Sequence, residues 1–285
     1  MEHRRRRRAA LLDVAAAAGL LSGCAPGTVS ALPDGVSVGV QQNRDDYGPR
    51  RIEVLVANTS DEPLDVWEAR LDSPAFAEAA TTDGPTTVRP GTTTALRLQL
   101  APPACAEPGA DARVRLAFTR GDVSGTAVVA PDDPLGSLPR IHAEDCLAER
   151  VAEVVSIVPG DAVTVAQEGG EPVAHLPVTL TPTGAAGGVS IPSIGRTILL
   201  RPASGEDAWP VGVRMDAGAA STRVDLAIVP SNCNTHTVSE DKRGTFLPVA
   251  VVLDDGTSGV VAIGVSDAVR GALYRFIAED SCRWE

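Results

Sequence analysis

Lysine is almost absent from this chain of 285 residues, in which Lys242 is the single example. The 25 basic residues are outnumbered by 37 Asp and Glu, which gives a formal net charge of −12 at pH 7. An acidic surface is repelled by nucleic acid and by anionic lipid headgroups. Nucleic acid is therefore not an expected partner.

Aromatic residues are also scarce, at 3% of the chain, and no aromatic platform for a carbohydrate is visible in the sequence. Trp67 follows Leu64 and precedes Leu71 in an apolar stretch, so we expect it to pack in a core. Residues that favour helices are few, whereas 27 Gly, 22 Pro and many Val and Thr favour short strands joined by turns. An all-β fold is the prediction.

Sequence motifs for catalysis are missing as well. The chain has no Gly-x-Ser-x-Gly elbow, Walker loop, dinucleotide fingerprint or His-Glu-x-x-His pair. The acidic pairs Asp132-Asp133 and Asp254-Asp255 lack a calcium-binding loop and predict turns. We expect no enzyme activity, no cofactor and no metal.

No apolar run reaches the length of about 20 residues that a membrane-spanning helix needs. The longest mostly apolar stretch near the start, Ala9 to Leu21, follows an unbroken basic run from Arg4 to Arg8. This layout is typical of a signal peptide, which we assign to residues 1–23. Asp13 places a charge within the apolar stretch, where it opposes insertion.

The signal ends in Leu21-Ser22-Gly23-Cys24, which resembles the lipobox of bacterial lipoproteins at all four positions. The resemblance implies that the thiol of Cys24 receives a diacylglycerol and that the mature chain begins there. The expected location is then the extracytoplasmic face of the cell membrane, with the membrane as a partner through the lipid anchor. Alternatively, Cys24 is a disulfide partner or a free thiol, although an odd total of five Cys favours lipidation. Removal of residues 1–23 changes the net charge from −12 to −15.

The rest of the chain contains an internal duplication. Residues 122–146 align with 255–282, and the segment ending at Cys105 aligns with the one ending at Cys233. The repeat predicts two β-sandwich domains of ordinary size. The predicted boundaries are a tether at 24–34, domain 1 at 35–148, a connector at 149–159 and domain 2 at 160–285.

The four remaining cysteines predict two disulfides, and four cysteines allow three pairings. Because they recur at the same two places in each repeat, we expect Cys105–Cys146 and Cys233–Cys282. In the chain-entropy estimate each bridge stabilises the fold by about 3 to 4 kcal/mol. The alternative, a metal site of four thiolates, is disfavoured because the sequence has no closely spaced Cys pair.

Alternation of apolar and polar residues locates the strands of the first domain. Val36, Val38 and Val40 share one face of a strand, and Ile52, Val54 and Val56 share one face of the next. The pattern suits an immunoglobulin-like sandwich, and VLVANTSDEPLDV (residues 54–66) resembles a turn of bacterial surface immunoglobulin-like domains. Further strands are predicted at residues 64–71, 94–100, 112–119, 125–130 and 138–143. Residues 148–157 are predicted to form a connecting strand or a short helix, and the Val154-Val155 pair favours the strand.

The most polar insertion of the second repeat, residues 231–244, contains His236, Asp241 and Lys242. Loops inserted on a rigid sandwich often carry binding function, so these residues are the candidate binding loop, although a solvated connection is the simpler interpretation. His142 is expected to be an edge or core histidine, and His175 to be solvated.

These features favour a lipid-anchored extracytoplasmic protein with a binding or structural role. One alternative is an accessory subunit of a cell-envelope complex with a protein partner. Another is an enzyme with a site between the two domains.

Overall fold

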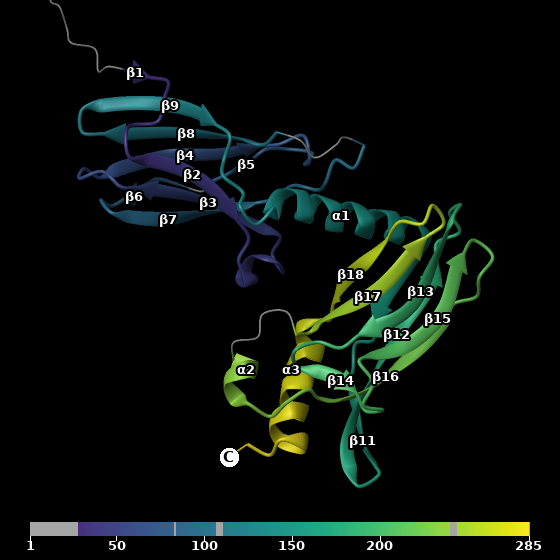
Figure 1. The fold of residues 1–285 in the computed structure, drawn as a ribbon. Helices are drawn as coiled ribbons and strands as arrows, with labels where there is room; N and C mark the ends of the chain where they lie inside the picture. Colours follow the sequence, from purple (N-terminus) through teal and green to yellow (C-terminus); the bar gives the residue numbers. More distant parts are fainter. Residues whose placement is uncertain (1–27, 83, 107–110, 240–243, 285) are drawn as a thin grey trace, which may run out of the picture.

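The computed structural model describes residues 28–82, 84–106, 111–239 and 244–284 of the chain. The predicted signal peptide and Cys24 lie outside these residues. Figure 1 shows a sheet-rich first half and a sheet-rich second half joined by one long helix, α1 (Ser137–Val154). The two halves form tandem β-sandwich domains, as the sequence predicts.

The first domain has two antiparallel sheets apart from one parallel pair, β1 with β9. One sheet has the order β1-β9-β8-β4-β5, with β6 also on β4, and the other has the order β2-β3-β7. The elements are β1 (Thr28–Val29), β2 (Val36–Gln41), the short helix η1 (Arg44–Asp46), β3 (Arg51–Asn58), β4 (Leu64–Asp72), β5 (Ala80–Thr81), β6 (Thr86–Val88), β7 (Thr92–Gln99), β8 (Arg113–Arg120) and β9 (Val123–Val129).

The second domain repeats this plan with antiparallel sheets of order β10-β12-β16-β14, with β11 also on β12, and β15-β13-β17-β18. Its elements are β10 (Val155–Pro159), β11 (Thr164–Glu168), β12 (Glu171–Pro182), β13 (Gly188–Gly195), β14 (Leu200–Pro202), β15 (Ala208–Asp216), β16 (Thr222–Pro230), α2 (Thr235–Ser239), β17 (Phe246–Leu253), β18 (Ser258–Gly264), α3 (Asp267–Arg275) and the π-helical turn η2 (Phe276–Ser281).

The predicted alternation of the early strands is confirmed. Ile52, Val54 and Val56 on β3 are completely buried, and Val38 and Val40 on β2 lie in the same core. The side chains between them point to the opposite face of each strand, where Glu53 is also buried. The strands expected at residues 64–71, 94–100, 112–119 and 125–130 are also present, as β4, β7, β8 and β9.

The strand predicted at residues 138–143 is wrong, because these residues open helix α1. The connector predicted as a strand at 148–157 is also mostly wrong, since the helix continues to Val154 before β10 begins. Asp133 explains the helix start: its Oδ1 accepts from the Ser137 amide at 2.7 Å and its Oδ2 from the Leu138 amide at 2.9 Å. Carboxylates in this position satisfy free amides at a helix N-terminus and interact well with its dipole.

The same difference recurs in the second repeat. The segment before Cys282, expected to alternate like its counterpart, forms α3 and η2. Ser266 caps α3 through its Oγ, which accepts from the Val269 amide at 3.3 Å. Each half therefore ends in a helical segment, which contains the second cysteine in the first half (Cys146) and directly precedes it in the second (Cys282).

Helix α1 belongs to both cores. Leu138 and Ile141 pack into the core of the first domain, whereas Val151 and Val154 pack into that of the second. A Cβ on Gly259 of β18 would lie 2.6 Å from Leu147 Cδ2, so the glycine lets the helix approach the second domain closely. Among the described residues, no helix combines the length and apolar character needed to cross a membrane.

Trp67 does not pack in the core as predicted, and 55% of its surface is exposed. The pairing of β4 with β8 shifts between Val66 and Glu68, which marks a β-bulge. A bulge inserts one extra residue, so Trp67 and Glu68 both face outward between the buried Val66 and Ala69.

Candidate functional site

A cleft of about 600 Å³ lies where the two domains and helix α1 meet. The first domain contributes the turn after η1, α1 contributes part of one face, and the second domain contributes β17, β18 and the loop after β13. The lining residues are Tyr47, Gly48, Arg50, Glu144, Asp145, Ala148, Arg196, Thr197, Ile198, Gly244, Phe246, Pro248, Val260 and Ala262. Cavities of this size accommodate small organic ligands.

The second domain supplies a mostly apolar wall to the cleft, apart from Arg196, whose Nε lies 3.1 Å from Asp207 Oδ1. Phe246 and Pro248 lie on β17, and Val260 and Ala262 lie on its neighbour β18, with Pro248 opposite Ala262 in the register. Ile198 adds a side chain that is 57% exposed, and Val260 is 52% exposed. Such exposed aliphatic side chains are available to contact a ligand.

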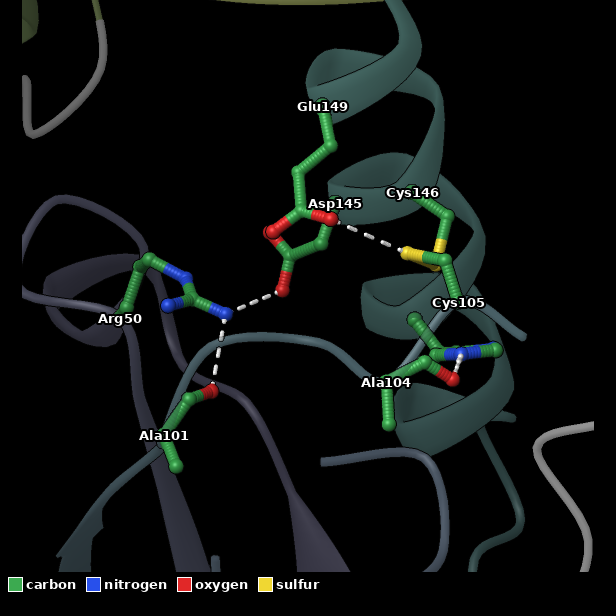
Figure 2. The surroundings of a disulfide bond; sticks show 8 residues. Arg50, Ala101, Ala104, Cys105, Asp145, Cys146 and Glu149 are labelled. Atoms are coloured by element: carbon green, nitrogen blue, oxygen red, sulfur yellow. Dashed lines mark hydrogen bonds and ion pairs between the residues drawn. A yellow bond between two sulfur atoms is a disulfide. The ribbon is translucent and has the colours of Figure 1, made fainter. Parts of the chain in front are cut away.

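The first domain and α1 supply charge. Arg50 Nη2 lies 2.5 Å from Asp145 Oδ2 and also donates to the carbonyl oxygen of Ala101 at 3.3 Å, as Figure 2 shows. Arg50 has a φ of 53°, a left-handed conformation that is uncommon outside glycine. The ion pair therefore ties the strained turn before β3 to helix α1 at the edge of the cleft.

A buried acidic pair supports the turn that leads to Arg50. Asp46 and Glu53 are 1% and 2% exposed, and Arg97 Nε lies 3.6 Å from Asp46 Oδ1 and 3.2 Å from Glu53 Oε1. Burial raises the pKa of Asp46, and the negative charge of Glu53 raises it further. Gln41 and Asn43 satisfy Glu53 through its Oε2 at 2.9 and 2.5 Å.

The expected disulfides are present, Cys105–Cys146 and Cys233–Cys282. In Figure 2, the first bridge fastens the loop after β7 to helix α1, one turn from Glu149. Glu149 Oε2 lies 3.4 Å from Cys105 Sγ. A nitrogen of His142 lies within 4.8 Å of both sulfur atoms, but a metal would need thiolates, and these sulfurs are bonded to each other.

His142 lies on α1 and not on a terminal strand, which corrects its predicted location. Its side chain is partly buried, and its Nε2 lies 3.4 Å from the carbonyl oxygen of Ala104. The first disulfide and this contact both hold the helix against the loop of the first domain.

The predicted binding loop is described only in part. His236 lies on the short helix α2 with an exposed side chain, and its backbone amide donates to Asn234 Oδ1 at 2.9 Å. His236 is not among the residues that line the cleft. Asp241 and Lys242 lie outside the described residues.

His175, expected to be solvated, is clasped by two carboxylates. Its Nδ1 lies 2.6 Å from Asp225 Oδ2 on β16, and its Nε2 lies 2.8 Å from Glu168 Oε1 on β11. The hydrogen bond to Asp225 chiefly raises the pKa of His175, with a further contribution from Glu168. The imidazole therefore links β12, on which it lies, to β11 and β16.

The turn predicted at Asp254-Asp255 is confirmed, whereas Asp132 forms a β-bridge with Gly39 and Asp133 directly precedes a turn. Asp254 and Asp255 form the turn between β17 and β18, where Asp255 Oδ2 lies 2.6 Å from Arg150 Nη2 of α1. Hydrogen bonds from Thr257 and Arg150 lower the pKa of Asp255 to about 2. This pair fastens the C-terminal half of α1 to the second domain.

Comparisons with known proteins add little. No protein-family model and no curated protein matches the chain. Among solved structures, red sea bream transglutaminase is 13% identical with a TM-score of 0.23, and the match covers 83% of this chain and 32% of that one. The match thus spans about a third of the length of that protein. The CsuC–CsuE chaperone–tip adhesin complex of Acinetobacter baumannii is 13% identical with a TM-score of 0.17, and the match covers 76% of this chain and 92% of that one.

The CBD12 structure from CALX1.2 is also 13% identical, with a TM-score of 0.19 and coverage of 73% of this chain and 77% of that one. Such low scores establish no relationship. The sandwich architecture rests on the strands and sheets of the chain itself.

Proposed function

We propose that the chain is a lipid-anchored, extracytoplasmic binding protein that takes a small amphiphilic ligand in the cleft between its two domains. One observation carries the proposal: helix α1 enters both cores, and the cleft beside it is lined both by apolar side chains of the second domain and by the Arg50–Asp145 ion pair. A ligand with an apolar body would lie against Ile198, Phe246 and Val260, with its polar end near Arg50 and Asp145.

The proposed extracytoplasmic, membrane-anchored location is supported by other observations. The two disulfides are typical of an oxidising compartment outside the cytoplasm. The lipobox Leu21-Ser22-Gly23-Cys24 adds the membrane anchor, which a Cys24→Ala variant would lose. We expect that variant to move from the membrane fraction to the soluble fraction of the envelope, whereas continued membrane association would count against the anchor.

The cleft can be tested with the amphiphilic dye 8-anilinonaphthalene-1-sulfonate, titrated into the folded full chain carrying Cys24→Ala. We expect saturable binding to one site, weakened roughly tenfold by Ile198→Glu and by Val260→Glu, because each places a charge on the apolar wall. Both side chains are more than half exposed, so the fold should tolerate the change.

The matched control is Val128→Glu, which changes a side chain that is 60% exposed on β9 of the first domain. It should leave dye binding unchanged. Binding that does not saturate, or that all three variants weaken equally, would contradict the cleft as the site.

A further inference from the structure

A second surface, remote from the cleft, surrounds Trp67 on the outer face of the sheet formed by β4, β8 and β9. The bulge after Val66 brings Trp67 and Glu68 outward together, opposite Ala117 of β8. Bulges re-aim side chains and are frequent next to binding and active sites. The exposed indole contrasts with Trp209, which is 5% exposed in the second core.

The indole is held in place and is not a loose surface side chain. Its Nε1 donates to Thr119 Oγ1 on β8 at 2.9 Å, and Thr119 Oγ1 lies 3.1 Å from Ser124 Oγ on β9. The indole N–H, the polar group of the ring, therefore already has a hydrogen-bond partner within the sheet. With 55% of the residue still exposed, the part left for a ligand is the aromatic surface.

The neighbours of Trp67 on this face are mostly polar. Thr87 Oγ1 donates to Asp65 Oδ1 at 2.6 Å, and Asp65 lies opposite Thr119 in the register. Thr126 lies opposite Ala117 on the next strand. A single aromatic ring is thus bordered by hydroxyl and carboxylate oxygens. Arg70 and Arg115 form the next cross-strand pair on the same face, two residues beyond Glu68 and Ala117.

An exposed aromatic ring surrounded by hydroxyl and carboxylate groups fits a saccharide ligand. A sugar ring offers an apolar face of C–H groups that stacks on an aromatic ring, and hydroxyls at its rim that bond to carboxylates and side-chain hydroxyls. A protein partner would require a broader apolar patch than one indole. Asp65 and Glu68 would also repel an anionic sugar.

We propose that this face is a binding site for an uncharged saccharide, with Trp67 as the stacking platform and Glu68 and Asp65 as hydroxyl acceptors. Thr119 is a positioning residue that fixes the ring. The site shares no residue with the cleft, so each can fail without the other.

The test uses the full chain with Cys24→Ala, which avoids detergent, and isothermal titration calorimetry with laminarin, maltoheptaose, N-acetylchitohexaose and anionic polygalacturonate. We expect binding of at least one of the three neutral saccharides, weakened roughly tenfold or more by Trp67→Ala. Trp67→Phe should retain part of the affinity because an aromatic ring remains. Thr119→Val should weaken binding although Trp67 itself is unchanged, because the indole loses the hydrogen bond that positions it.

The matched control is Leu135→Ala, which removes a side chain that is 71% exposed outside this sheet. It should bind as the parent does. The proposal is overturned if no neutral saccharide binds, if Trp67→Ala binds as well as Leu135→Ala, or if polygalacturonate binds more tightly than every neutral probe.

Discussion

Among single residues, the hydrogen-bond partners of a histidine decide whether its protonation contributes to the stability of the fold. Glu168 and Asp225 lie on two strands that flank His175, and both accept from its imidazole. Sequence could place His175 in a strand but could not show these partners, because one comes from β11 and the other from β16. The alternation at Ile52, Val54 and Val56, by contrast, depends only on local sequence and was predictable.

The raised pKa of His175 makes a pH-dependent contribution to stability. A folded-state pKa above the unfolded value of about 6.5 stabilises the fold fully below that value, and the contribution is lost as the pH rises through the folded-state pKa. We therefore expect the advantage in Tm of the native protein over His175→Gln to be largest below about pH 6.5 and to shrink as the pH is raised above that value.

Thermal unfolding at several pH values measures this difference. His236→Gln, which alters the exposed imidazole of α2, controls for the loss of any surface histidine. A difference in Tm between the native protein and His175→Gln that stays constant with pH would show that the hydrogen bonds of His175 with Glu168 and Asp225 make no pH-dependent contribution to stability.

At the scale of elements, helix α1 shows what sequence reasoning misses. The spacing of three residues between Leu138 and Ile141 fits one face of a helix, but the segment was predicted to alternate like a strand in both repeats. The deciding interactions are the cap from Asp133 and burial against two separate cores, which arise only in the fold. The disulfide partners were predictable because the repeat itself selects them.

The Asp133 cap gives a direct test of the helix. Asp133→Ala removes the acceptor for two amides of α1 and should lower the free energy of unfolding by about 1 to 2 kcal/mol. Asp132→Ala is the matched control, because Asp132 bonds to Val38 and Val40 through its backbone and these bonds survive the change. Denaturant unfolding measures both variants, and equal stabilities would contradict the cap.

At the scale of the whole molecule, one helix couples two domains. Ile141 lies in the first core and Val154 in the second, so neither core is complete without α1. The cleft lies where the two domains meet this helix, and no local pattern in the sequence revealed that Arg50 and Phe246 would line the same cleft. Trp67 was likewise misplaced because a bulge depends on strand pairing.

Shared packing predicts coupled unfolding. Differential scanning calorimetry should give one transition in which the calorimetric and van't Hoff enthalpies agree. Ile141→Ala leaves a cavity in the first core, costs about 2 to 4 kcal/mol and should shift the whole transition. Two transitions, of which only one responds to Ile141→Ala, would mean that α1 does not join the domains into one unit.

We propose that the chain is an anchored, disulfide-closed two-domain protein outside the cytoplasm, and peptide mapping by mass spectrometry of unreduced protein from native membranes can test this. We expect a first peptide that begins at Cys24 with a diacylglycerol on its sulfur, together with linked peptides for Cys105–Cys146 and Cys233–Cys282. An uncleaved N-terminus with an unmodified Cys24, or disulfides that run between the two halves, would contradict it.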